Sequence, residues 1–289
     1  MKYQRVIEAY GLGVDDDGRT LVFETADGRW SLPGGLVRHG EHPQDALASA
    51  VADQLGGAVE VTGVQAVLTD IDKNALVTTH YDRIVFSVRL LSASRAHWVV
   101  AQEVPLVAAT DRILAGQQSE NHHVGRVAWS TVPGESRTRR QRFAAYALAT
   151  DPAGHVLLTL ISDGYPGAGR WHLPGGGTDF GESAAAGVVR EIEEETGQHG
   201  LITGLIGVSH RHQRDARGPE GRTMDWHGVR VVYRVAVPEP TEPRVIDQGG
   251  STAAAAWFLP VRALELPLTE VAYDMVAGEI GRASWVVDA

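Results

Sequence analysis

The sequence contains no cysteine among its 289 residues. Disulfide bonds and thiolate metal sites are therefore excluded, which leaves carboxylate and imidazole groups as the side-chain ligands for any metal. The chain is also short of positive charge, with 26 Lys and Arg against 36 Asp and Glu and a formal net charge of −10. That balance argues against binding to nucleic-acid polymers, while a local basic pocket for a small phosphorylated ligand stays open.

Long apolar runs are missing as well. No stretch approaches the ~20 apolar residues that a membrane-spanning helix needs, and the N-terminal MKYQRVIEAYG has no apolar core of a signal peptide. We therefore expect no membrane partner and a cytoplasmic location. The composition, with 43% apolar and 21% charged residues, is typical of a globular protein, and the length is enough for two domains.

An acidic cluster lies in the second half of the chain. Glu191, Glu194 and Glu195 belong to a segment without proline, and at ~100° per residue they share one face of a helix. Carboxylates that crowd together repel one another unless a cation joins them, which favours a divalent-metal site with oxygen ligands. Arg190 precedes Glu194 by one helical turn and can orient it by a charge-assisted hydrogen bond. A solvated acidic helix face is the alternative.

A glycine-rich stretch precedes this predicted helix. Pro174 to Gly177 predicts a loop where backbone can approach a ligand or a metal closely. Gly181 and Glu182 then lead into the helix, with Ser183 as its N-cap.

The two stretches together, from Gly176 through Glu182 and the ArgGluIleGluGluGlu run at 190–195 to Gly197, closely resemble the Nudix box. The sequence departs from the box at Gln198, where the family has an apolar residue. The resemblance implies an α/β/α sandwich with a mixed sheet. It also implies Mg²⁺-dependent hydrolysis of the diphosphate bond in a nucleoside diphosphate linked to another group, with Mn²⁺ as the other candidate ion.

The resemblance also assigns roles to individual residues. Glu191, Glu194 and Glu195 would be the metal ligands, together with a backbone carbonyl of Gly175 or Gly176. Glu191 or Glu194 would orient the attacking water, and the sequence does not divide these tasks between them. The remaining assignments are Arg190 as a catalytic residue and Glu182 and Gly197 as supporting residues.

The first part of the chain is an earlier copy of the second. The sequence WSLPGG at 30–35 is echoed by WHLPGG at 171–176, and a Gly-Glu pair follows both at the same spacing. Farther along, the apolar run at 84–90 is echoed at 229–237. We therefore predict two tandem Nudix-fold domains that act as a covalent pseudo-dimer. Their predicted bounds are 1–132 and 138–289, with the junction near 131–138. Whether two chains associate further is left open.

The first copy is predicted to be non-catalytic. Ser49, Ala50, Asp53 and Gln54 stand where the second copy has Arg190, Glu191, Glu194 and Glu195. A single remaining carboxylate is expected to hold Mg²⁺ weakly. A structural or substrate-shaping role is therefore favoured for the first domain.

Six residues outside the box are assigned to substrate binding. His210, Arg211 and His212 head a long polar segment, predicted to be a loop that covers phosphates, with a solvated loop as the alternative. Trp226 directly precedes a predicted strand and is a candidate for stacking on a base, although core packing is the favoured reading. The other two assigned residues are Tyr165, which belongs to an extra loop of the second copy, and Arg170, which follows that loop.

Two accessory groups that many relatives carry are missing. The strand that ends at 159–162 has no arginine, and Ala253 to Ala256 replace the acid that often precedes the final Trp-aromatic pair. Asp247, or an acid within 213–225, is the candidate replacement. A small-molecule nucleotide hydrolase is thus the leading hypothesis, and a non-catalytic nucleotide-binding sensor on the same scaffold is the second.

Overall fold

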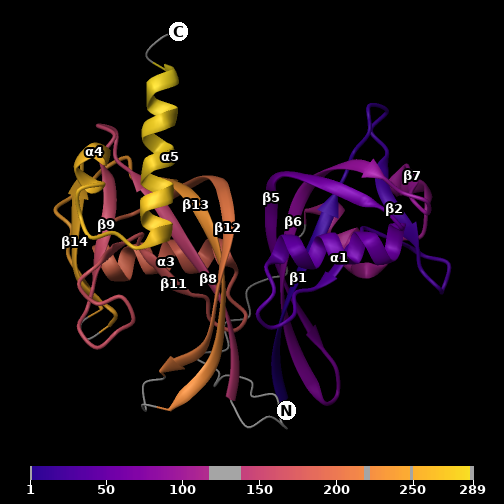
Figure 1. The fold of residues 1–289 in the computed structure, drawn as a ribbon, viewed down its shortest axis with the longest axis horizontal. Coiled ribbons are helices and arrows are strands. Elements are labelled where there is room, and N and C mark those ends of the chain that lie inside the picture. The colour runs from indigo at the N-terminus through magenta and orange to yellow at the C-terminus, as the bar shows by residue number, and fades with distance from the viewer. Residues whose placement is uncertain (1, 117–137, 218–221, 248–249, 287–289) are drawn as a thin grey trace. The chain divides into compact units, whose positions relative to one another are not determined.

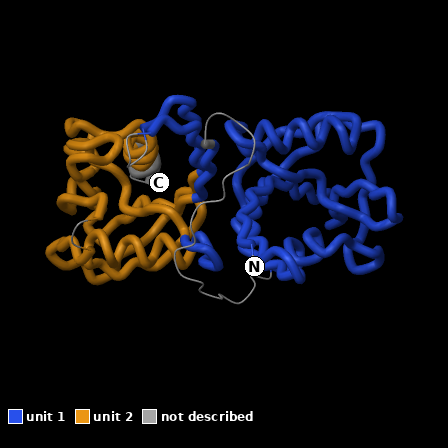
Figure 2. The backbone as a smooth tube through the Cα atoms, turned by 90° about the horizontal axis from the view of Figure 1, so that it is seen from below, with its two compact units in different colours: residues 1–143, 179–184, 207–229 blue, residues 144–178, 185–206, 230–289 orange. Residues whose placement is uncertain are grey.

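The computed structural model describes residues 2–116, 138–217, 222–247 and 250–286. They divide into two compact units (Figure 2), each of which is considered by itself. Unit 1 comprises 1–143, 179–184 and 207–229, and unit 2 comprises 144–178, 185–206 and 230–289. Residues 131–137 of the predicted junction lie outside the described residues, so the domain bounds stay a prediction.

Unit 1 contains a mixed sheet with the strand order β4-β1-β6-β5 and a smaller sheet with the order β3-β2-β7 (Figure 1). Strand β1 pairs parallel with β6 and antiparallel with β4, and β5 pairs antiparallel with β6. The bounds are β1 (Lys2–Leu12), β2 (Thr20–Glu24), β3 (Trp30–Ser31), β4 (Gly34–Leu36), α1 (Pro43–Leu55), β5 (Ala58–Lys73), β6 (Val77–Ser92), β7 (His97–Val99), η1 (Ala101–Glu103) and α2 (Ala108–Ala115).

Helix α1 has clear start and stop signals. The N-cap residue His42 accepts a hydrogen bond from the Gln44 N–H through its ring, and Pro43 occupies the first helical position. Gly56 ends the helix in the left-handed conformation at φ +61°. Buried Leu47, Val51 and Leu55 recur at helical spacing and fix the face of α1 that meets the sheets.

The rest of the chain forms a third sheet with the order β10-β9-β8-β13-β12, in which β14 pairs with β9 and β11 with β8. Strands β8, β12 and β13 have residues in both units. The bounds are β8 (Thr138–Thr150), β9 (Val156–Ile161), β10 (Trp171–His172), β11 (Gly175–Gly177), α3 (Ala184–Thr196), β12 (Leu201–Arg217), β13 (Thr223–Ala236), β14 (Thr252–Phe258), α4 (Pro260–Ala263) and α5 (Glu270–Val286).

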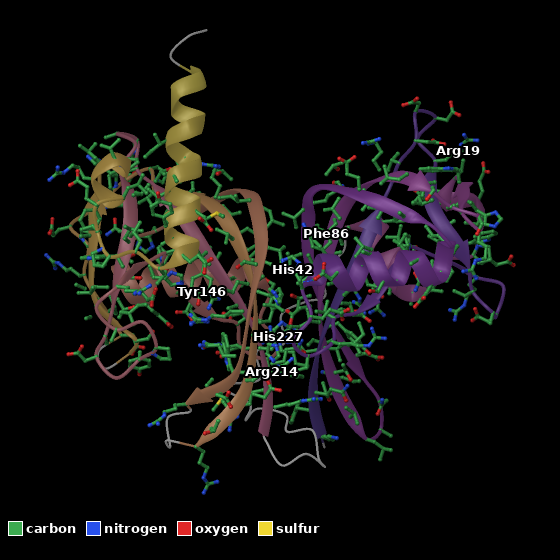
Figure 3. The ribbon with its side chains drawn as sticks, in the orientation of Figure 1. Arg19, His42, Phe86, Tyr146, Arg214 and His227 are labelled. Atoms are coloured by element: carbon green, nitrogen blue, oxygen red, sulfur yellow. The ribbon has the colours of Figure 1, made fainter. Side chains whose placement is uncertain are left out.

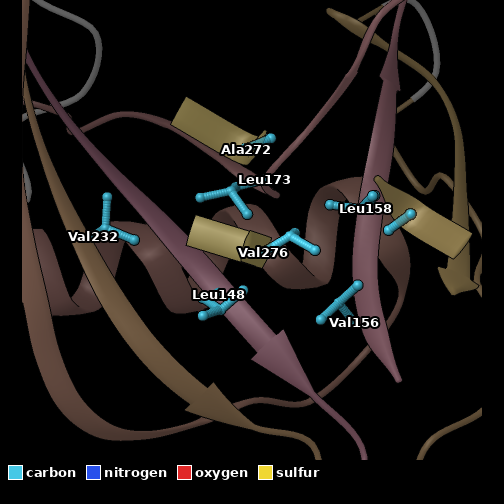
Figure 4. Packing of buried hydrophobic residues seen from close by; sticks show 8 residues of the cluster. Leu148, Val156, Leu158, Leu173, Val232, Ala272 and Val276 are labelled. Carbon is cyan, nitrogen blue, oxygen red and sulfur yellow. The ribbon is translucent and has the colours of Figure 1, made fainter. Parts of the chain in front are cut away.

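The core of unit 2 lies between this sheet and helices α4 and α5. Leu148 from β8, Leu158 from β9 and Val232 from β13 contribute the sheet side, and Ala272 and Val276 contribute the α5 side (Figure 4). Each of these side chains is almost completely buried. Consecutive residues 156–159 of β9 are buried, so both faces of this strand are covered, and α5 packs on the face that carries Leu158.

The fold confirms the predicted α/β class, since helices pack on sheets and the sheet of unit 1 is mixed. The apolar runs predicted as strands at 21–23 and 156–160 lie in β2 and β9. None of the helices in the described residues combines the length and the apolar character that crossing a membrane requires.

Three local predictions were wrong. The segment that begins at His210 is not a loop, because β12 continues to Arg217 beside β13. Trp226 does not precede a strand but lies within β13. The stretch Gly175–Gly177 is a short strand that pairs with β8. In all three cases pairing with a neighbouring strand satisfies the backbone and outweighs polar or glycine-rich local composition.

Candidate functional site

The glycine segment Gly175–Gly177 lies directly against its neighbours. Gly175 has φ +137°, and a Cβ atom there would be 2.3 Å from the carbonyl oxygen of Ala145 on β8. A Cβ atom on Gly176 would be 2.6 Å from Oε1 of Glu191. Glycine is therefore required at Gly175 by backbone conformation and by space, and Gly176 lets a carboxylate of α3 lie against the backbone.

Arg190 joins two of the predicted metal ligands. Its Nη1 lies 2.9 Å from Oε2 of Glu194 and 3.1 Å from Oε1 of Glu191. Its Nη2 donates a hydrogen bond of 3.3 Å to the carbonyl oxygen of Gly177. One guanidinium thus fixes two carboxylates and the glycine segment in a single network, with Glu191 the more buried and Glu194 the more exposed of the two acids.

Glu195 points inward, and only 8% of its surface is exposed. Its Oε2 accepts a hydrogen bond of 2.8 Å from the Gly175 N–H, and its Oε1 accepts one of 2.5 Å from the Thr252 hydroxyl. Burial raises the pKa of Glu195 to about 7; the two hydrogen bonds oppose the rise, and the charges of Glu191 and Glu194 add to it. A cation nearby would favour the ionised form of this side chain.

The C-terminal end of α3 is held by the segment before β14. Gly197 adopts φ +67° and donates its N–H to the carbonyl of Glu193 at 2.9 Å. The N–H groups of Ile246 and Asp247 both donate to the carbonyl of Glu194, at 2.9 and 3.0 Å. The backbone of Asp247, the candidate replacement acid, is therefore anchored at the turn of α3 that carries Glu194.

The turn that precedes α3 belongs to unit 1. Oε2 of Glu182, which is buried, accepts a hydrogen bond of 2.8 Å from the Asp179 N–H and so fixes this turn. The N–H of Gly181 donates to Nδ1 of His80 at 2.9 Å, and Nε2 of His80 lies 3.1 Å from Asp82. Sequence reasoning missed His80, Asp82 and Thr252, because none of them belongs to a local pattern and their partners are distant in sequence.

The six residues predicted to bind substrate are divided between the two units. Arg170 lines a cavity of about 470 Å³ beside α4 and α5, and the glutamates of α3 do not line it. Tyr165 lies in a turn and is 44% exposed. The other four residues, His210, Arg211, His212 and Trp226, lie on β12 and β13 in unit 1. Their role in substrate binding stays a prediction.

Comparison with known proteins identifies a domain family in the second half of the chain. Residues 140–277 match the family model of the NUDIX domain. Over 67 residues the chain is 54% identical to a Bacillus subtilis protein named as a candidate 8-oxo-dGTP diphosphatase, covering 23% of this chain and 42% of that protein. Over 77 residues it is 45% identical to the ADP-ribose pyrophosphatase of Methanocaldococcus jannaschii, covering 27% of this chain and 41% of that protein.

A solved structure, the MutT NUDIX hydrolase from Burkholderia pseudomallei, is 30% identical with a TM-score of 0.37, covering 48% of this chain and 97% of that chain. The chain spans less than half the length of the two curated relatives. The matched segment contains the glycine segment, Arg190 and all three glutamates of α3. Residues 140–277 are therefore a NUDIX domain, and this part of the chain belongs to the Nudix hydrolase family.

Proposed function

We propose that the NUDIX domain hydrolyses the diphosphate bond of a small nucleotide-type substrate, a nucleoside diphosphate linked to another group, with Mg²⁺ or Mn²⁺. The observation that carries the proposal is the Arg190 network, which ties Glu191 and Glu194 to the glycine segment. The names of the two curated relatives, which refer to 8-oxo-dGTP and ADP-ribose, agree with this class of substrate.

The donor groups at the site fit a hard divalent cation. Carboxylates of Glu191, Glu194 and Glu195 and the carbonyl oxygens of Gly175 and Gly176 are the oxygen ligands that Mg²⁺ prefers. The missing side chain at Gly176 leaves backbone exposed to the carboxylate of Glu191, since a Cβ atom would lie 2.6 Å from its Oε1. A bound divalent cation would neutralise phosphate oxygens and lower the pKa of a bound water.

The side chains of α3 then have separable tasks. Glu191 and Glu194 would bind the metal, and one of them would orient the attacking water. Arg190 keeps both carboxylates in place and holds the carbonyl of Gly177. Glu195 anchors the glycine segment by accepting a hydrogen bond from the Gly175 N–H, and a bound cation would favour its ionised form. Asp247 is proposed as the acid that takes the place of the one missing before Trp257.

We also infer that residues 1–132 are a second, non-catalytic copy of the fold. A Cβ atom on Gly34 would lie 2.3 Å from the Ala9 carbonyl, the same distance that separates a Cβ on Gly175 from the Ala145 carbonyl. Gln54 accepts a hydrogen bond from the Gly34 N–H and donates one to the Gly34 carbonyl, both at 2.9 Å. It thus anchors its glycine as Glu195 does, without a charge.

The test is a panel of nucleotides and other diphosphates incubated with the purified chain and Mg²⁺ or Mn²⁺, with products identified by mass so that the cleaved bond is known. Glu191→Gln and Glu194→Gln should each reduce turnover by roughly 100-fold or more, since metal stabilisation of the transition state amounts to several kcal/mol. Glu193→Gln is the matched control, because Glu193 lies on the same helix and its side chain is exposed.

Equal turnover in Glu191→Gln, Glu194→Gln and Glu193→Gln would contradict the assignment. Binding of nucleotides without any turnover across the panel would instead favour the sensor hypothesis. The variant Glu195→Gln separates the hydrogen bond to Gly175 from the negative charge of Glu195. It removes the charge but can keep the hydrogen bond, since the amide of Gln54 makes the corresponding bond to Gly34.

A further inference from the structure

A group of imidazole and carboxylate side chains lies in unit 1, separate from the glutamates of α3. Nε2 of His212 is 2.6 Å from Oδ1 of Asp225, and Nε2 of His39 is 3.1 Å from the same oxygen. One ligand atom from each of the three residues lies within 4.8 Å of the others. All three residues belong to unit 1, and each side chain is mostly buried.

The backbone is arranged to bring these side chains together. His212 lies on β12 and Asp225 on the neighbouring strand β13, while His39 comes from the turn between β4 and α1. Gly40 has φ +83°, and a Cβ atom there would be 2.8 Å from the ring of His212. Any side chain at this position would therefore displace the ring, so the glycine makes room for the imidazole.

Hydrogen bonding does not fully satisfy this group. Nε2 of His39 is buried and has no hydrogen-bond partner among the described residues, although the Asp225 oxygen lies only 3.1 Å away. The nitrogen is thus close to the carboxylate but not aligned with it. The second oxygen of Asp225, Oδ2, lies 3.6 Å from Nε of Arg139, which leaves Oδ1 facing the two imidazoles. A buried polar atom of this kind requires an explanation.

We propose that His39, His212 and Asp225 bind a divalent transition-metal ion of the zinc class. Two imidazole nitrogens and one carboxylate oxygen are ligands that Zn²⁺ takes, whereas Mg²⁺ prefers sites built from oxygen alone. An ion placed between the three atoms would give Nε2 of His39 its missing partner. Three protein ligands leave the fourth position of a tetrahedral ion to water or to an external ligand.

Other histidines surround the site but are turned to other partners. His227 has its Nδ1 3.1 Å from the Gln141 amide nitrogen and its Nε2 3.4 Å from Nδ1 of His210. The ring of His42 packs edge-on against His210 at 4.8 Å, and both His42 and His227 are labelled in Figure 3. Of these rings, His227 packs edge-on against His39 at 5.5 Å and lies 6.0 Å from His212, so it supports their orientation, as outer groups do around metal ions.

The turn before α3 offers an internal comparison. Phe180 directly precedes Gly181, as His39 directly precedes Gly40. The ring of Phe180 packs edge-on against His80 at 5.4 Å, and the ring of His39 packs edge-on against His212 at 5.3 Å. Packing at this position therefore needs only an aromatic ring. The imidazole of His39 adds a ligand atom that packing does not require.

The experiment uses the full chain, stripped of metal and then dialysed against Zn²⁺ with Mg²⁺ in excess to occupy oxygen-ligand sites. We expect one Zn²⁺ retained per chain. His39→Gln and His212→Gln should each weaken Zn²⁺ binding by more than about 100-fold, since even outer partners of metal ligands are worth 10–100-fold. His155→Gln is the matched control. His155 lies 2.7 Å from Asp151, but among the described residues this pair has no third metal-ligating side chain beside it.

Co²⁺ provides a readout that does not depend on the folding of any variant. Co²⁺ bound by the wild-type chain at this site should show the strong visible absorption of a tetrahedral ion, and an excess of Zn²⁺ should abolish it. Zn²⁺ binding that is unchanged in His39→Gln and His212→Gln would overturn the proposal. So would a wild-type chain that retains no Zn²⁺, or one whose bound Co²⁺ gives only the weak visible spectrum of an octahedral ion. None of these outcomes bears on hydrolysis, which is tested with Mg²⁺ and with the glutamates of α3.

Discussion

The stability of unit 2 should fall on mild acidification because of His172. This residue lies on β10, with its Nδ1 2.5 Å from the Thr269 hydroxyl and its ring packed against Tyr146 at 4.7 Å. Burial lowers the pKa of His172 from 6.5 to about 3, and the positive charge of Arg230 adds to the effect. The folded protein therefore holds this imidazole neutral at pH values where the unfolded chain already binds a proton.

The sign and size of the effect follow from the two pKa values. A histidine whose pKa is lowered in the folded state makes its full contribution to the free energy of unfolding above about pH 6.5. This contribution is lost as the pH falls toward about 3. Between pH 7.5 and pH 5.0 this amounts to at most about 2 kcal/mol. The variant His172→Gln has no titrating group at this position, so its free energy of unfolding should fall by that much less over the same range.

The assay is hydrogen exchange followed by mass spectrometry across a urea series, read on peptides that span β9 and β10. This reports the free energy of unfolding for unit 2 alone. His199→Gln is the control, because His199 belongs to the same unit and is exposed; it should keep the wild-type pH dependence. A His172→Gln variant whose stability changes with pH as the wild type does would refute the reasoning.

Three further predictions concern packing and charge, each measured by chemical unfolding. Asp82 is completely buried, which by itself would raise its pKa, but the charge of Arg5 and the hydrogen bonds from Arg5 and His80 outweigh burial and lower the pKa to about 2. Asp82→Asn should therefore destabilise unit 1 by roughly 2–3 kcal/mol at neutral pH. The difference should shrink as the pH falls from about 4 toward 2, and a constant difference would exclude the charge effect. Leu158→Ala should destabilise unit 2 by about 3 kcal/mol, because it leaves a cavity in the core. The control Leu201→Ala removes an exposed side chain and should change the free energy of unfolding little. Equal effects of the two variants would show that Leu158 does not lie in the core. Gly175→Ala should lower both stability and turnover, since its Cβ would overlap the Ala145 carbonyl. The control is Gly204→Ala, because no atom of the described residues lies within 4 Å of a Cβ placed there. Equal, neutral effects of the two variants would contradict the backbone geometry.

The parts of the site that the sequence predicts are those built within one helix turn. Arg190 meets Glu194 because residues four apart on a helix are neighbours, and the helix begins at Ala184, directly after the predicted N-cap Ser183. The α/β class is implied by the resemblance to the Nudix box, which this helix and the glycine segment carry.

Contacts between distant segments were not predictable from spacing. The hydroxyl of Thr252 reaches Glu195 only because β14 pairs with β9 in the same sheet, and nothing near Thr252 in the sequence marks it. The polar composition of β12 from His210 onward predicts a loop, because the pairing that satisfies its backbone comes from β13, which the local sequence does not reveal. His39 and Asp225 likewise become neighbours only through the tertiary fold.

The amide of Gln54 gives the same support to Gly34 that the carboxylate of Glu195 gives to Gly175. An exchange of the acid for its amide at this position removes the charge and keeps the hydrogen bond to the backbone N–H of the glycine. The support of the glycine thus needs no charge, so the requirements of folding and those of metal binding are separable at this position.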